Sequence, residues 1–206
     1  MKKIAIVALA LAALAGCSKN PEEPAASRPA PENFRVKFDT SKGPFTIEVT
    51  RAMAPLGADR FYDLVQQNFF DDARFFRVLK GFVVQFGINK NPEVQAKWEH
   101  ANLQDDPVRQ TNARGTIVFA TGGPNTRTTQ LFINLADNAR LDQSGFAPFG
   151  KVVEGMEVVD SLYGGYGEGA PQGAGPDQTV ITSEGNRYLE GNFPKLDFIK
   201  TARVVQ

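Results

Sequence analysis

The sequence predicts a mainly β fold, a closed antiparallel barrel that includes one or two helices. Short segments of alternating apolar and polar residues recur along the chain, and turn residues separate them. Apolar residues with helical spacing occur in two segments. A chain of 206 residues, 42% of them apolar, is long enough to form one core without disulfides or metal.

The first part of this fold is predicted to be a β-hairpin followed by a helix. Residues 34–39 and 45–50 alternate apolar and polar side chains, and a Ser-Lys-Gly turn lies between them. Pro55 is well suited to begin a helix, because its missing N–H is not needed in the first helical turn. The next apolar residues have helical spacing, namely Phe61, Leu64 and Val65.

Six further strands and a second helix are predicted in the rest of the chain. The second helix covers residues 154–163 and precedes the last strand. The strand segments are short, apolar and bounded by turn residues: 75–78, 81–86, 116–120, 130–134, 148–153 and 201–205.

Two connecting segments have distinctive compositions. Residues 88–114 are polar and predict a long loop, a feature that is often functional in a compact domain. Residues 164–177 are rich in Gly and Pro and predict a flexible loop. A Gly-x-Gly-x-x-Ala pattern from Gly165 to Ala170 loosely fits a dinucleotide fingerprint, but it follows a helix rather than a strand, so we reject it.

The N-terminus predicts export and lipid attachment. Residues 1–16 combine two lysines with a short apolar run, which is typical of a signal peptide. The end of this segment and the next residue, Leu14-Ala15-Gly16-Cys17, resemble a bacterial lipobox, in which the cysteine is acylated and binds the bilayer. The alternative is that the cysteine is incidental. Residues 17–33 contain four prolines and predict a tether to a domain at 34–206. Ser18 favours an outer-membrane anchor that faces the periplasm.

Charge and composition exclude several functional classes. Lys plus Arg and Asp plus Glu number 23 each, which argues against a nucleic-acid-binding protein. One cysteine and one histidine, His100, exclude an internal disulfide and a Cys-cluster or two-His metal site. The chain has no Gly-x-Ser-x-Gly elbow, so nothing indicates a hydrolase. We therefore expect no metal and no cofactor.

Two segments place polar residues within apolar runs. Arg77 lies among aromatic residues in segment 75–87, where burial of its charge is costly without a partner or a function. A Gly-Gly-Pro-Asn turn at 122–125 leads into a strand on which Gln130 and Phe132 face the same side. Residue types alone favour the alternative, a salt-bridged structural arginine and an ordinary turn, over a functional site.

These two segments resemble the cyclophilin-type peptidyl-prolyl cis–trans isomerases. The resemblance covers residues 34–206, and its motifs occur in the family's order. They are Phe76-Arg77-Val78, Gly81-Phe82, Gln85, Gly123-Pro124-Asn125-Thr126, Gln130, Phe132-Ile133, Phe149-Gly150-Lys151-Val152 and Glu154-Gly155-Met156.

The resemblance implies a closed barrel of eight antiparallel strands capped by two helices, and a monomer. It also implies that Arg77 is the catalytic arginine and that Gln85 binds the substrate carbonyl region. Ala120, Thr121 and Gln130 would flank the groove, and Phe146 would take the place of a groove histidine. The residues that would line the proline pocket are Phe82, Val83, Phe132 and Leu141.

The chain departs from the family pattern at four positions. Phe76 replaces the usual histidine, Phe86 replaces a glycine, and Val83 stands where methionine is common. Arg140 replaces the tryptophan that helps many members to bind cyclosporin. Phe76 and Phe86 would narrow the groove.

The expected function is isomerisation of X–Pro bonds in proteins that fold outside the cytoplasm. Proline-containing peptides and unfolded proteins would be the partners, without a covalent intermediate. The alternative is a non-catalytic peptide-binding or chaperone module of the cell envelope. A purely structural envelope lipoprotein would leave Arg77 and Gln85 without a role.

Overall fold

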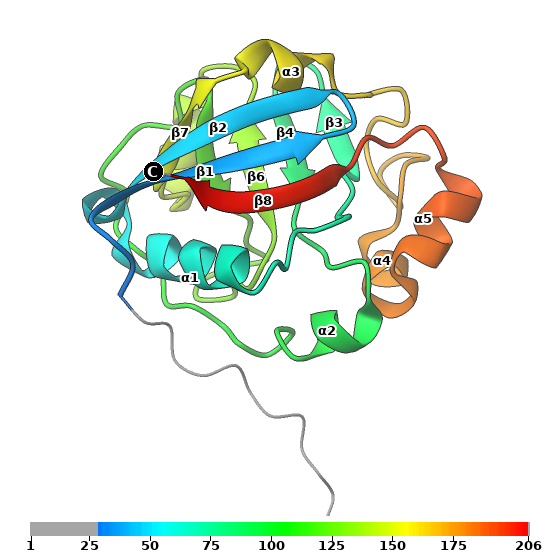
Figure 1. Ribbon diagram of the computed structural model, residues 1–206, viewed down its shortest axis with the longest axis horizontal. Helices are drawn as coiled ribbons and strands as arrows, with labels where there is room; N and C mark the ends of the chain where they lie inside the picture. The colour runs from blue at the N-terminus through cyan, green and yellow to red at the C-terminus, as the bar shows by residue number, and fades with distance from the viewer. Residues whose placement is uncertain (1–28, 206) are drawn as a thin grey trace, which may run out of the picture.

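The computed structural model of the protein describes residues 29–205, so the predicted signal peptide and Cys17 lie outside the described residues. Its centre is an eight-stranded antiparallel sheet with the strand order β3-β4-β6-β5-β7-β2-β1-β8 (Figure 1). The strands are β1 (Asn33–Thr40), β2 (Gly43–Thr50), β3 (Arg77–Leu79), β4 (Val83–Phe86), β5 (Thr116–Phe119), β6 (Leu131–Asn134), β7 (Gly150–Glu154) and β8 (Ile199–Val205).

The sheet curls into an open half-barrel, so the predicted closure is wrong. β3 and β8 are the two edge strands. The segment before β3 meets the start of β8 at an isolated bridge, Arg74 with Phe198. Backbone hydrogen bonds flank this bridge, with Phe75 N–H donating to the Asp197 carbonyl at 3.0 Å and Ile199 N–H to the Ala73 carbonyl at 2.9 Å. β3 has three residues, and Gly164 approaches it so closely that a Cβ there would lie 3.1 Å from the Val78 carbonyl oxygen. A short and covered β3 cannot pair along β8.

An aromatic core fills the concave side of the sheet. The rings of Phe38 and Phe45 stack with centroids 4.9 Å apart, and Phe86 meets Phe38 edge-on at 5.9 Å. Helix α1 (Pro55–Gln66) covers the core beside β8, as Figure 1 shows, and buries Phe61 and Leu64 completely. The predicted helix with Pro55 in its first turn is confirmed, because its apolar spacing matches the buried face.

The helices after α1 agree with the sequence prediction at α3 (Met156–Ser161) and depart from it at α2 (Pro92–Ala96), α4 (Gln178–Glu184) and α5 (Asn186–Asn192). Helix α2 lies within the predicted polar loop, and α3 lies within the predicted second helix. Helices α4 and α5 were not predicted, so the two-helix cap is wrong within the described part of the chain. None of the helices between residues 29 and 205 combines the length and apolar character that membrane crossing requires.

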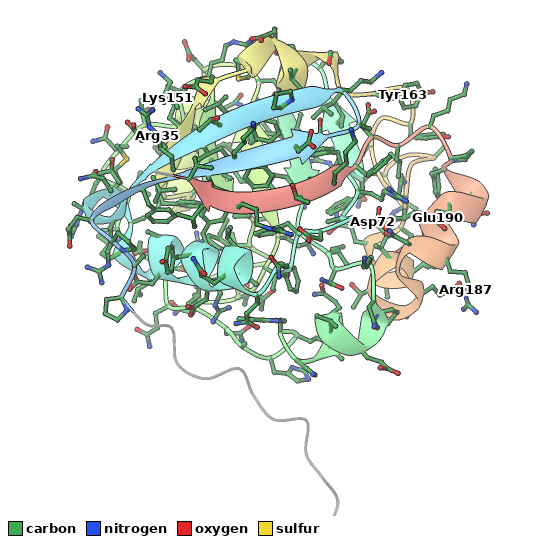
Figure 2. The ribbon with its side chains drawn as sticks, in the orientation of Figure 1. Arg35, Asp72, Lys151, Tyr163, Arg187 and Glu190 are labelled. Carbon is green, nitrogen blue, oxygen red and sulfur yellow. The ribbon has the colours of Figure 1, made fainter. Side chains whose placement is uncertain are left out.

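A second, smaller core joins α4 and α5 to the sheet. Ile181 and Leu189 each form the buried residue of their helix, and both pack in a cluster with Phe76. Arg74 adds polar contacts, because it donates to Asp72 at 3.1 Å and to Glu190 at 2.8 Å. Figure 2 labels Asp72 and Glu190 on this side of the molecule. The segment before β3 is therefore fixed to α5.

The start of the described chain packs on the domain. Ala30 is buried, and its N–H donates to Asp59 Oδ1 at 2.8 Å. Asp59 also accepts from Arg51 Nε at 2.7 Å, which fixes this contact beside α1. The chain thus enters the domain at α1.

Candidate active site

Strand register brings Arg77 and Gln85 together. They are partners in the antiparallel pairing of β3 with β4. Arg77 Nη1 donates to Gln85 Oε1 at 3.2 Å, and Gln85 Nε2 donates to Gln130 Oε1 at 2.9 Å. Gln85 is buried, so both halves of its amide are satisfied by these neighbours. The result is a row of polar side chains across the end of the sheet.

A carboxylate that the sequence did not indicate holds the other side of Arg77. Arg77 Nε donates to Glu168 Oε1 at 2.6 Å, and Nη2 donates to Oε2 at 2.8 Å. The hydrogen bonds from Arg77 lower the pKa of Glu168 and outweigh the desolvation that would raise it. Glu168 is therefore ionised at neutral pH, and the pair is a bidentate ion pair.

Apolar residues form a compact cluster beside Arg77. Phe132 meets Phe146 edge-on with centroids 5.4 Å apart, and the Arg77 guanidinium lies 5.9 Å from the Phe82 ring centroid. Val118 also belongs to the cluster and was not predicted; its alternation with core residues Ile117 and Phe119 on β5 was the available signal. The predicted groove residues in the cluster are Phe82, Val83, Ala120, Phe132, Leu141 and Phe146.

Two side-chain directions differ from the expected alternation. Strict alternation along one strand would place Phe82 on the same face as Val84 and Phe86, yet it packs in the groove cluster while those two lie in the main core. The reason is that β4 begins at Val83, so Phe82 belongs to the preceding turn. Phe75 likewise precedes β3 and packs in the main core instead of beside Arg77.

A polar cavity of about 300 Å³ continues the groove. Thr121 was expected at this position, and its hydroxyl contacts the Gly123 carbonyl and Thr126 Oγ1, the latter at 3.0 Å. A larger cavity of about 520 Å³ lies between α2 and α4 and shares Gln130 and Gln178 with the first. The lining of the smaller cavity is Gln85, Ala120, Thr121, Gly122, Thr126, Thr128, Gln130 and Gln178.

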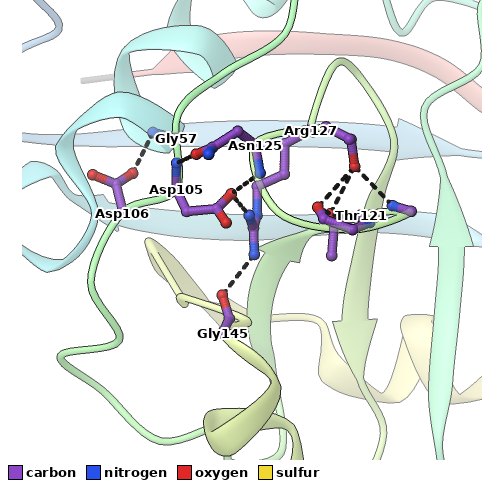
Figure 3. Close-up of polar contacts among 10 residues, drawn as sticks. Gly57, Asp105, Asp106, Thr121, Asn125, Arg127 and Gly145 are labelled. Carbon is purple, nitrogen blue, oxygen red and sulfur yellow. Dashed lines mark hydrogen bonds and ion pairs between the residues drawn. The ribbon is translucent and has the colours of Figure 1, made fainter.

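Part of the polar segment 88–114 supports the turn that forms this cavity. Figure 3 shows Arg127 paired with Asp105 and donating to the Gly145 carbonyl, at 2.6 Å. Asp105 N–H donates to Asn125 Oδ1 at 2.8 Å, and Asp106 Oδ2 accepts from Gly57 N–H at 2.8 Å. The segment predicted as a functional loop therefore acts here as a brace between α1 and the turn.

Comparison with known proteins identifies the family of this chain. The profile of the family described as cyclophilin type peptidyl-prolyl cis-trans isomerase/CLD matches residues 35–183. The chain belongs to this family. An isomerase of Acinetobacter baylyi is 36% identical over 136 residues, which cover 63% of this chain and 72% of that protein. Peptidyl-prolyl cis-trans isomerase A of Dickeya dadantii is 38% identical over 146 residues, covering 65% and 73%.

A solved cyclophilin agrees in fold. The crystal structure of a cyclophilin type isomerase from Cryptosporidium parvum superimposes with a TM-score of 0.60 at 18% sequence identity. The match covers 84% of this chain and 98% of that one. At this identity the similarity concerns the architecture alone.

Two of the four departures from the family pattern lie away from the groove, whereas Val83 belongs to the groove cluster and Arg140 lies at its rim. Phe76 is buried in the second core and Phe86 in the main core, so the expectation that they narrow the groove is wrong. The exposed Arg140 lies over the Phe82 ring, with its guanidinium carbon 5.0 Å from the centroid. One rim of this cyclophilin groove is therefore cationic. Among residues 29–205, no group of three or more His, Asp or Glu side chains is placed to hold a metal ion.

Proposed function

We propose that this chain catalyses cis–trans isomerisation of X–Pro bonds in polypeptides that fold outside the cytoplasm. The observation that carries the proposal is an oriented arginine beside an apolar cluster. Arg77 has five N–H donors, of which Glu168 and Gln85 engage three, so two stay available to a bound amide. The family resemblance further implies that the protein acts as a monomer.

The reaction requires electrostatic stabilisation of the twisted amide and no nucleophile. The X–Pro bond resists rotation because its nitrogen lone pair is delocalised into the carbonyl, with a barrier of about 18–20 kcal/mol. An N–H of Arg77 that donates to the prolyl nitrogen stabilises the twisted amide, in which the lone pair is localised. The apolar cluster holds the ring and excludes water, which would favour the charge-separated planar amide.

The size of the rate enhancement shows how much of the reduction in barrier height Arg77 alone can supply. Acceleration from about 0.01 to about 1000 per second requires roughly 7 kcal/mol. One hydrogen bond from a charged donor contributes about 1.5–3 kcal/mol. The remainder comes from tighter binding of the twisted amide than of the planar one. The polar cavity beside Gln85 offers donors and acceptors for the residues that precede the proline.

The decisive experiment is NMR exchange spectroscopy on a short proline peptide with catalytic amounts of the full chain. Arg77→Ala should lower the exchange rate by about 100-fold, near the upper end of what about 1.5–3 kcal/mol allows, while circular dichroism and Tm stay close to wild type. Activity within about threefold of wild type would show that Arg77 does not have this role. A folded wild-type protein that shifts peptide resonances without exchange would instead be a peptide-binding module.

The proposed location rests on the N-terminal sequence. Acylated Cys17 would bind the bilayer, and Ser18 favours the outer membrane, with the domain in the periplasm. Residues 17–33 would hold the domain off the membrane surface. Mass spectrometry of the mature protein from cells should show a lipid-modified N-terminal cysteine, and Cys17→Ser should move the protein to the aqueous phase on detergent partition. A mature chain without lipid would refute the anchor.

A further inference from the structure

The contact between Arg77 and Glu168 joins parts of the chain that lie far apart in sequence. Both carboxylate oxygens are engaged, at 2.6 and 2.8 Å, and they lie along one edge of the guanidinium. Gln85 accepts from the remaining terminal nitrogen at 3.2 Å. Contacts on two sides fix the plane of the guanidinium more tightly than either contact alone.

We propose that Glu168 is a positioning residue for the reaction, which orients the Arg77 guanidinium so that its two remaining N–H groups face the prolyl amide. The inference rests on the proposed isomerase function. Arg77 side-chain atoms are 19% exposed, so a free guanidinium would have room to change rotamer. An arginine fixed before substrate binds does not lose this freedom during the reaction.

The loop that carries Glu168 is folded on itself around this residue. Gly175 N–H donates to the Glu168 carbonyl at 2.9 Å, and Gly169 N–H donates to Glu168 Oε1 at 3.0 Å. A Cβ at Gly175 would lie 2.8 Å from the Glu168 carbonyl oxygen, and Gly173 is similarly crowded against it. These positions therefore require glycine, and the Gly-rich composition permits the compact conformation that presents the carboxylate.

The second core holds this loop against the sheet. Tyr166 meets Phe193 edge-on with centroids 5.0 Å apart, and it meets Tyr163 at 5.2 Å. The same cluster contains Phe76, the residue directly before Arg77. Phe76 thus links the strand of the arginine to the helices that support the loop of the glutamate. Phenylalanine fits this position, where histidine is usual in the family, because its side chain packs in this apolar cluster.

A purely structural ion pair is the competing explanation, and a double-mutant cycle separates the two. Activity of the full chain would be measured for wild type, Glu168→Gln, Arg77→Ala and the double variant. Glu168→Gln should lower kcat by about tenfold and leave KM within about twofold, because orientation matters most in the transition state. In the Arg77→Ala background, the same change should alter activity by less than about twofold.

The chain provides a matched control in Glu48. Glu48 accepts with one oxygen, Oε2, from both Arg35 Nε at 2.9 Å and Nη2 at 2.8 Å, and its side chain is 42% exposed against 36% for Glu168. Figure 2 shows Arg35 at the opposite end of the molecule from Tyr163, which precedes the loop. Glu48→Gln should therefore leave kcat within about 1.5-fold of wild type, since it breaks a similar pair elsewhere.

Two further measurements keep the test independent of folding. Glu168→Asp retains the charge on a shorter side chain, and it should recover part of the lost kcat. The ¹⁵N-edited signal of Arg77 Nε–H should exchange slowly with water in wild type and fast in Glu168→Gln. A kcat for Glu168→Gln within about twofold of wild type, or an equal loss in the Arg77→Ala background, would overturn the positioning role. An inactive wild type would overturn the proposed function as well, whereas an Arg77→Ala variant with wild-type activity would overturn the role of Arg77 and leave the isomerase function standing.

Discussion

Arg77 is held from two sides that the chain builds in different ways. On the sheet side, Gln85 and Gln130 are placed by adjacent antiparallel strands, and Gln85 is only 8% exposed. On the loop side, Glu168 comes from a glycine-rich segment, and its side chain is 36% exposed. The strand ladder supports the first side along its length, whereas a small aromatic core supports the second.

This difference predicts how the two sides respond to mutation. Loss of a polar group on the buried sheet side leaves its partners without hydrogen bonds, so stability and activity should fall together. Loss of the carboxylate on the loop side exposes Arg77 to water, which can replace the missing acceptor. Activity should then fall more than stability.

The largest effect after that of Arg77→Ala itself is expected from Gln85→Ala. The variant removes the acceptor of Arg77 Nη1 and the donor to Gln130 Oε1. Loss of a hydrogen bond to a charged group costs about 1.5–3 kcal/mol, which corresponds to a fall in kcat/KM of about 30-fold. The free energy of unfolding should also fall, by about 1–2 kcal/mol. NMR exchange and urea titration measure the two quantities.

Gln95 is the matched control for this substitution. It is 5% exposed, and its Oε1 accepts from Asn89 N–H at 2.8 Å, outside the Arg77 network. Gln95→Ala should lower stability by a similar amount and leave kcat unchanged. Equal losses of kcat in Gln85→Ala and Gln95→Ala would mean that the sheet side acts through general stability alone.

A smaller effect is expected from Gly175→Ala on the loop side. The added Cβ would meet the Glu168 carbonyl oxygen at 2.8 Å, so the loop must move and carry its carboxylate with it. We expect kcat to fall by about fivefold, less than in Glu168→Gln, with little change in Tm. Gly191→Ala is the control, because nothing lies within 4 Å of a Cβ there and alanine favours the helix. If both variants keep wild-type kcat, the loop conformation does not govern the site.

The sheet side was largely predictable from the sequence. Period-two alternation located β1 and β2, and short apolar runs between turn residues located the other strands. The motifs around Arg77, Gln85 and Gln130 placed these residues at one groove. Alternation could not decide whether the barrel closes. Closure depends on the length of β3 and on what covers its edge, and both are properties of the packed molecule.

The loop side was not predictable, for two physical reasons. Helices α4 and α5 have seven residues each and bury one residue each, too few for a periodic signal. Glu168 stands 91 residues after Arg77 in a segment without periodicity. The cost of burying Arg77 indicated either a partner or a function, and 23 acidic residues were candidates for the partner. Only the folded loop selects one.

The smallest expected effect is that of low pH on the free energy of unfolding. It distinguishes the two sides of Arg77, because the loop side holds a carboxylate, Glu168, and the sheet side holds amides. The hydrogen bonds from Arg77 hold the pKa of Glu168 below its ordinary value. The resulting stability is fully present above the unfolded-state pKa of about 4.3, and it is lost as the pH falls through the lower folded-state pKa. Because Glu168 is partly exposed, the difference in unfolding free energy between wild type and Glu168→Gln should stay below about 1 kcal/mol at pH 7.

That difference should shrink towards zero as the pH falls below the unfolded-state pKa and through the lower folded-state pKa of Glu168, because the folded-state carboxyl group then becomes protonated. Urea titrations of both proteins between pH 3 and pH 7 would measure it, and other carboxyl groups cancel in the subtraction. Gln85→Ala should instead show a stability difference from wild type that is independent of pH, since an amide does not titrate. A pH-independent difference for Glu168→Gln would mean that its carboxylate is not engaged by Arg77 in solution, and the contrast between the two sides of the arginine would disappear.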